Sequence, residues 1–220
     1  MTPSSTSRPG SSNEPTTLGP SGPSTLTLAR LTLLTTARTA VDPAAHGSIG
    51  AVRVLSVDLG TSNTVAVLSV PGLPPRLVEI EGSATMPSAV FALDDGRFAV
   101  GRDAQRRARL DPDRYEPNPK RRIDEGSLPL GGVVVPVTEA LAAVLRRVAG
   151  EAARLPGGDR LDEVRLTHPW RWGPVQRGVL LGAAHRVAGF AGRVILIPEP
   201  LAAAAHFAMA PGCSSRPGHA

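Results

Sequence analysis

From residue 52 onward, short apolar runs alternate with groups of polar and turn-forming residues. Residues 52–58 and 64–70 are apolar and rich in valine, and each run predicts a buried strand. The five residues between them include Gly60, an arrangement typical of a β-hairpin. A third strand is predicted over residues 76–80.

Beyond residue 100 the pattern alternates between helical and strand periods. Helices are predicted over residues 100–110, 138–154 and 174–188, strands over 164–167 and 193–197, and a last short helix through Phe207. Thr138 is the expected N-cap of the middle helix. This order of elements predicts an α/β fold with an antiparallel beginning.

The first 50 residues differ in composition from the rest of the chain. They contain eight Ser, ten Thr, six Pro and five Gly, and the first aromatic residue is Phe91. Because so few large apolar groups cannot offset the conformational entropy lost on ordering, we expect a disordered leader over 1–50. A secretory signal around residues 26–34 and a misplaced start codon are the alternatives. We expect the folded part to span 51–209 and an unstructured tail to span 210–220.

Charge and cysteine content restrict the function classes. The 24 basic residues include one lysine, Lys120, and they are interspersed with 19 acidic residues, for a net charge of +5. Without a clustered basic face, nucleic acid is not an expected partner. The single cysteine, Cys213, fits a reducing compartment. No apolar run approaches the roughly 20 residues that span a bilayer, so we expect a cytoplasmic protein without a membrane partner.

Candidate chemistry begins at the turn after the first strand. Asp58 ends that strand, where a carboxylate could lie near a magnesium ion that keeps its waters. Gly60 allows close approach of the backbone, and the N–H groups of Thr61, Ser62 and Asn63 could form a concavity for phosphate oxygens. The alternative is an ordinary hairpin turn, because these residue types are common in turns.

The turn is also the first of several segments that resemble the DnaK-type, seventy-kilodalton heat-shock chaperones, members of the actin and sugar-kinase ATPase superfamily. The segments occur in the family's order at residues 57–64, 86–90, 100–104, 120–121, 169–177, 188–190 and 197–204. The resemblance covers about residues 52–208. It implies the first lobe of a ribonuclease-H-like, actin-like ATPase domain, with a mixed sheet and flanking helices.

The resemblance also implies roles for individual residues. Gly60, Thr61, Ser62 and Asn63 would hold the β- and γ-phosphates of ATP, and Asp58 would reach Mg²⁺ through water. Lys120 would stabilise charge on the γ-phosphate and the attacking water, and Glu199 would orient that water or accept its proton. Pro169 and Arg177 would belong to the relay between nucleotide state and peptide binding. Unfolded polypeptides and co-chaperones would be the partners of a larger protein of this kind.

Each role has a simpler alternative. A lysine beside two arginines is usually solvated, and Glu199 between two prolines could be part of an ordinary loop. Against the first alternative, the chain uses arginine everywhere except at this position. Trp170 and Trp172 are expected to pack rather than to stack on a base.

The chain also departs from the family. A short Gly-rich connection is expected between Lys120 and the helix at Thr138, where the family has a longer subdomain. His168 replaces an apolar residue, Pro198 and Leu201 replace an Asn and a Thr, and the family's second phosphate loop and adenosine segment are not found. We therefore expect weak ATP binding and little or no hydrolysis by the chain alone. The alternatives are a non-enzymatic remnant or half-domain that docks to a partner, and a sugar-kinase or actin-like member of the superfamily.

Overall fold

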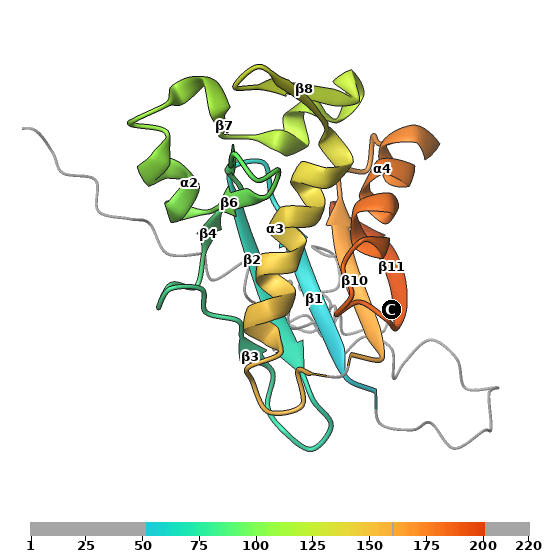
Figure 1. Cartoon of the computed structure of the whole chain (residues 1–220). Helices are drawn as coiled ribbons and strands as arrows, with labels where there is room; N and C mark the ends of the chain where they lie inside the picture. Colours follow the sequence, from blue (N-terminus) through green and yellow to red (C-terminus); the bar gives the residue numbers. More distant parts are fainter. Residues whose placement is uncertain (1–51, 160, 201–220) are drawn as a thin grey trace, which may run out of the picture.

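A six-stranded mixed sheet organises the part of the chain that the computed structural model describes, residues 52–159 and 161–200 (Figure 1). Its strands are β1 (Val54–Leu59), β2 (Asn63–Ser69), β3 (Arg76–Leu77), β4 (Met86–Pro87), β10 (Glu163–His168) and β11 (Arg193–Pro198). The order is β11-β10-β1-β2-β3, and β4 also pairs with β2. The predicted leader, the helix through Phe207 and the tail lie outside the described residues.

Strand direction changes at β1. β1 pairs in parallel with β10, which pairs in parallel with β11, whereas β1 and β2 form an antiparallel hairpin. The predicted hairpin and the antiparallel beginning are therefore confirmed. The predicted third strand is shorter than expected, because only Arg76 and Leu77 pair with β2. The sheet with its flanking helices confirms the predicted α/β class.

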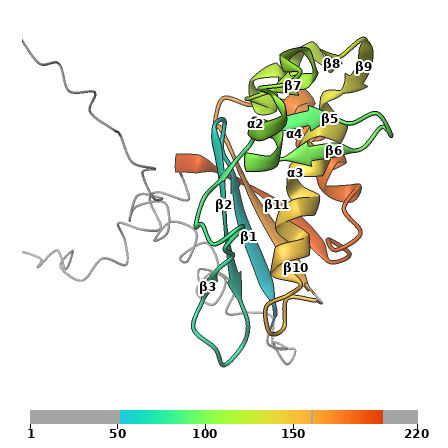
Figure 2. The ribbon, with the colours of Figure 1, turned by 60° about the vertical axis from the view of Figure 1, so that its left-hand side comes forward.

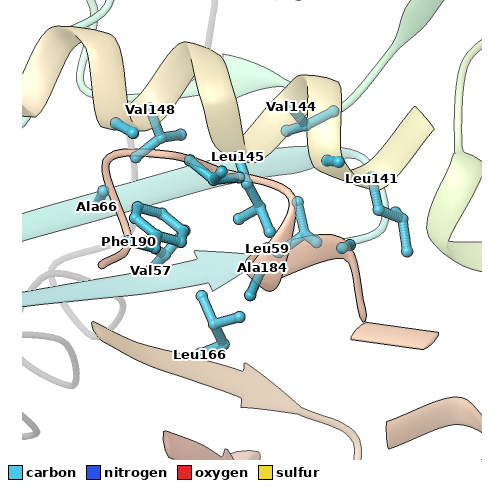
Figure 3. Close-up of a cluster of buried hydrophobic side chains, with 14 of the residues drawn as sticks. Val57, Leu59, Ala66, Leu141, Val144, Leu145, Val148, Leu166, Ala184 and Phe190 are labelled. Carbon is cyan, nitrogen blue, oxygen red and sulfur yellow. The ribbon is translucent and has the colours of Figure 1, made fainter. Parts of the chain in front are cut away.

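Two helices, α3 (Val137–Ala152) and α4 (Pro174–His185), pack against the sheet and against each other. Figure 2 shows α3 on one side of β1 and β2. Their contact with the sheet is an aliphatic core, in which Val57, Leu59 and Leu166 of the strands face α3 and Phe190 (Figure 3). Burial of this apolar surface is the main stabilising contribution of the fold.

The start of α3 corrects one prediction. Its N-cap is Pro136, not Thr138, so the helix begins two residues earlier than that cap requires. The Val137 N–H donates a hydrogen bond to the Gly126 carbonyl (3.0 Å). A backbone carbonyl thus satisfies the free N–H group of the first helical residue, whereas a threonine N-cap side chain binds the N–H group of the second or third.

A smaller region lies beyond one end of the main sheet (Figure 1). It contains β5 (Val90–Ala92), β6 (Phe98–Val100), β7 (Tyr115–Glu116), β8 (Ser127–Leu130), β9 (Val133–Pro136), α2 (Arg102–Arg107) and the 3₁₀ helices η2 (Pro112–Arg114) and η3 (Pro119–Glu125). The segment at residues 86–90 that carries part of the resemblance is divided between β4 and β5, and the helix predicted over 100–110 is shortened to α2.

The expected Gly-rich connection after Lys120 is a β8–β9 hairpin. Its turn contains Gly131 and Gly132, both with positive φ (59° and 83°), a conformation that glycine adopts without strain. No helix within the described residues combines the length and apolar character needed to cross a bilayer.

Candidate functional site

The turn between β1 and β2 lies at the end of the sheet that faces the smaller region (Figure 1). Asp58 is half-buried near the end of β1, whereas Ser62 and Asn63 are exposed. Parallel strands bring their carboxyl ends to one edge, so the end of β10 lies beside Asp58. The turn is thus a hairpin loop that lies between the end of β10 and the smaller region.

Ser88 fastens this loop from the side of β4. Its hydroxyl donates a hydrogen bond to the Gly60 carbonyl (2.8 Å), and its backbone N–H donates to the Ser62 carbonyl (2.9 Å). Because the Ser88 hydroxyl has only one proton, it accepts the hydrogen bond that it shares with Thr64 (2.9 Å). Ser88 is fully buried, so these bonds are protected from water.

Asn118, immediately before η3, holds the remaining carbonyl of the loop. In the orientation that satisfies both ends of its amide, the Asn118 side chain donates to the Thr61 carbonyl (3.1 Å). The carbonyls of Gly60, Thr61 and Ser62 therefore each accept a hydrogen bond, from Ser88 or from Asn118.

This pattern determines where the N–H groups of the loop point. In a trans peptide the carbonyl of one residue and the N–H of the next point in opposite directions. The N–H groups of Thr61, Ser62 and Asn63 therefore face away from Ser88 and Asn118. At Gly60, a Cβ atom would lie 2.3 Å from the Asn63 carbonyl oxygen, so a side chain would deform the loop.

Asp58 is oriented by Thr167, at the adjacent end of β10. The Thr167 hydroxyl donates to Oδ1 of Asp58 (2.6 Å), and Thr167 is itself buried. A carboxylate that is hydrogen-bonded through one oxygen keeps acceptor sites on the other. Asp58 therefore offers a fixed negative charge beside the loop.

Lys120 lies on η3, which packs against α3 and α4. Its side chain is 5% exposed, so it is not the solvated surface lysine of the simpler alternative. Nζ lies 3.4 Å from Oε1 of Glu199, an ion pair that joins residues 79 positions apart. Burial lowers the pKa of Lys120 below its ordinary value of 10.5, and the negative charges of Glu199 and Asp58 oppose this shift.

The other residues that the sequence singled out are more peripheral. Arg177 is exposed on the first turn of α4, where its Nε donates to the Gly173 carbonyl (3.3 Å). Trp172 packs against the main core as expected, but Trp170 does not, because it is 65% exposed.

The structure brings Asp58, the loop from Gly60 to Asn63, Lys120 and Glu199 to one end of the sheet. Sequence reasoning did not identify Ser88, Asn118 or Thr167 as parts of this site. Only Ser88 carried a signal, through the resemblance at residues 86–90, and no local pattern pointed to the other two.

The chain is similar in sequence to chaperone proteins of the DnaK and HscA types. No family model matches the chain. The chaperone protein DnaK of Halobacterium salinarum is 31% identical over 153 residues, which cover 69% of this chain and 24% of that protein. An HscA homolog of Azotobacter vinelandii is 32% identical over 181 residues (70% and 28%). Chaperone protein dnaK3 of Thermosynechococcus vestitus is 32% identical over 182 residues (71% and 26%).

The curated homologues of this chain are DnaK and HscA chaperones. The chain spans about a quarter of the length of these chaperones. The resemblance seen in the sequence is thus confirmed at the level of homology. The mixed sheet with its flanking helices is compatible with an actin-like ATPase lobe of such chaperones.

Proposed function

We propose that this chain is a nucleotide-binding lobe of the DnaK type, in which residues 51–209 form part of an actin-like ATPase domain. The observation that carries the proposal is the ion pair of the buried Lys120 with Glu199, beside Asp58 and the β1–β2 loop. Burial of a lysine ammonium costs folding free energy, and its role in stabilising phosphate charge would explain why the lysine is buried here. The DnaK and HscA relatives favour a chaperone over a sugar kinase or an actin-like filament protein.

The residues fit a magnesium-bound triphosphate. Ser88 and Asn118 bind the loop carbonyls, so the loop N–H groups on the other side can donate to phosphate oxygens. The loop also has Gly60 at a position where a Cβ atom would collide with the backbone. The Asp58 carboxylate is a hard oxygen ligand that suits Mg²⁺, directly or through water. When bound, Mg²⁺ would neutralise part of the phosphate charge.

In this proposal, the N–H groups of Thr61, Ser62 and Asn63 orient the β- and γ-phosphates. The Lys120 ammonium donates to the γ-phosphoryl oxygens, where negative charge must be stabilised during phosphoryl transfer. Glu199, 37% exposed, keeps Lys120 charged and orients a water or accepts its proton. Pro169 and Arg177 would carry the state of the site to a peptide-binding partner.

For the 220-residue chain alone we propose weak ATP binding and little hydrolysis. All the named groups contact the phosphates from one side, and positioning and exclusion of water both need a second wall. Cytoplasmic location, unfolded clients and co-chaperones remain part of the proposal, for the larger assembly in which such a lobe would work.

The proposal is tested by titrating the ¹⁵N-labelled chain with MgATP and following the backbone amides of the loop by NMR. The amides of Thr61, Ser62 and Asn63 should shift and saturate above the micromolar range, with little phosphate release. Gly60→Ala should abolish the shifts, because its Cβ would meet the Asn63 carbonyl. Gly178→Ala is the matched control, since a Cβ there meets nothing within 4 Å.

Two results would contradict the proposal. Loop amides that do not respond to MgATP would reject the site. Micromolar affinity with turnover like that of a complete chaperone would reject the claim that the chain is weak alone.

A further inference from the structure

Trp172 contacts two basic side chains of the site region. The Lys120 Nζ lies 5.2 Å from the centroid of the Trp172 ring. The His168 ring lies parallel to the indole, with a centroid separation of 6.3 Å and an angle of 14° between the planes. Trp172 packs against the main core, so both contacts occur in a partly desolvated environment.

His168 holds the other side of this arrangement in a fixed orientation. It is 3% exposed, and its Nδ1 lies 2.8 Å from the Pro169 carbonyl oxygen. Because a carbonyl oxygen only accepts, Nδ1 carries the proton in this contact. The imidazole therefore cannot rotate freely, and it restrains the indole that stacks on it.

The chain's other tryptophan provides an internal contrast. Trp170 is 65% exposed, and its ring contacts Arg171, whose Cζ lies 5.3 Å from the ring centroid. Cation–π attraction is weaker at exposed sites than at desolvated ones. Two tryptophans two residues apart thus contact cations in different environments, and only Trp172 reaches the buried lysine.

Lys120 needs more than Glu199 to hold it in place. A lysine has a flexible four-carbon stem, and the ion pair with Glu199 is a single contact of 3.4 Å. Asp58 adds a second negative charge, whose effect on Lys120 is coulombic. A further carboxylate in contact with the ammonium would hold it but would also repel an incoming phosphate. An aromatic face attracts the ammonium without neutralising it, so the N–H donors stay available.

We propose that Trp172 is a positioning residue, which holds the Lys120 ammonium at the β1–β2 loop through its ring face. This inference rests on the function proposed above. It explains a tryptophan that packs between a locked imidazole and the only lysine of the chain.

The single lysine makes the test direct. Labelling the 220-residue chain with ¹³Cε-lysine gives one side-chain NMR signal, from Lys120. In the wild type without nucleotide, its Hε protons should lie upfield of free lysine because of the indole ring current. Trp172→Leu should return them toward the free position and lower the pKa of Lys120 further. Trp172→Phe should keep part of the upfield displacement, and Trp170→Leu should leave the signal unchanged.

Nucleotide binding provides the functional arm of the experiment. Trp172→Leu should weaken MgATP binding about three- to tenfold, with partial rescue in Trp172→Phe. The inference would be overturned if the Lys120 signal of the folded wild type lay at the chemical shift of free lysine. It would also be overturned if Trp170→Leu shifted the signal as much as Trp172→Leu. If Trp172→Leu does not fold, the comparison of wild type with Trp172→Phe decides, and identical signals overturn it.

The ring-current measurement needs no nucleotide, so it separates the two claims. An upfield Lys120 signal that depends on Trp172 but does not respond to MgATP would overturn the proposed function alone. A signal that responds to MgATP without any dependence on Trp172 would overturn the positioning role alone.

Discussion

The two faces of the central sheet carry different kinds of residue, although β1 contributes to both. Leu55, Val57 and Leu59 alternate into the core against α3 and α4. Ser56 and Asp58 point to the opposite face, which also carries a buried ion pair between Arg165 and Glu163 (2.6 Å). That face also has a small apolar cluster of Val65, Val67, Leu77 and Ile197. The aliphatic face with its larger core therefore contributes most to stability, whereas the opposite face adds polar groups whose burial is costly unless each is paired.

The contrast separates two kinds of substitution. A change on the aliphatic face should alter the free energy of unfolding and leave the chemistry of the remaining folded molecules intact. A change at the polar end of the sheet should alter ligand binding more than stability.

The largest effect is expected on the aliphatic face. Leu145→Ala on α3 should cost about 2–5 kcal/mol of unfolding free energy, because Leu145 is fully buried and its loss leaves a cavity. Urea unfolding followed by circular dichroism measures it. Leu110→Ala is the control: Leu110 is 90% exposed, and its loss should change stability by less than about 0.5 kcal/mol. Equal losses in the two variants would contradict the assignment of the core.

The loop support should show a mixed effect. Ser88→Ala removes the partner of the part-buried Gly60 carbonyl and of the buried Thr64 hydroxyl, which should cost about 1–3 kcal/mol. The loop amides should also lose part of their response to MgATP. Ser69→Ala, at the far end of β2, serves as the control. A Ser88 variant with full stability and unchanged loop amides would show that Ser88 does not support the loop.

At Asp58, binding should fall while stability is kept. Asp58→Asn retains an oxygen that accepts from Thr167, so the free energy of unfolding should change by less than about 1 kcal/mol. Removal of the charge should weaken MgATP binding about tenfold or more, as measured by calorimetric or NMR titration. Asp103→Asn, in an exposed pair with Arg106, should leave binding unchanged. Equal affinities for both variants would remove Asp58 from the site.

The smallest effect concerns Lys120 and pH. Burial lowers its pKa in the folded state, so the unfolded state binds more protons between that lowered pKa and the ordinary value of 10.5. The energetic penalty is complete below the folded pKa and is relieved as pH rises toward 10.5. Lys120→Met should therefore be at least as stable as the wild type at neutral pH, because the half-exposed Glu199 can be solvated.

Unfolding experiments from pH 7 to pH 10.5 check this prediction. The stability difference between Lys120→Met and the wild type should shrink as pH rises. A variant that is clearly less stable than the wild type at pH 7 would mean that the Lys120–Glu199 pair stabilises the fold.

The larger elements could be predicted from local patterns. β1, β2, β10, β11, α3 and α4 have apolar periodicities that survive in the structure, within a few residues at their ends. The smaller region could not, because β5, β6 and β7 have only two or three residues each, too few to show a period. η3, which carries Lys120, is a 3₁₀ helix with the same difficulty.

The site residues also differ in whether a local sequence pattern reveals them. The loop residues and Asp58 are contiguous, so their candidacy was visible in the sequence. Asn118 and Thr167 join the site through contacts across 57 and 109 positions, for which no local pattern exists. Lys120 was visible only as a compositional exception and through the family resemblance.

In the proposed function Lys120 faces bound phosphate, and the NMR signal of this single lysine reports on that contact. On titration of the ¹³Cε-lysine-labelled chain with MgATP, we expect a saturable shift of the Lys120 signal, strongly reduced in Asp58→Asn. A Lys120 signal that stays in place while the chain is folded and the nucleotide is in excess would contradict the account.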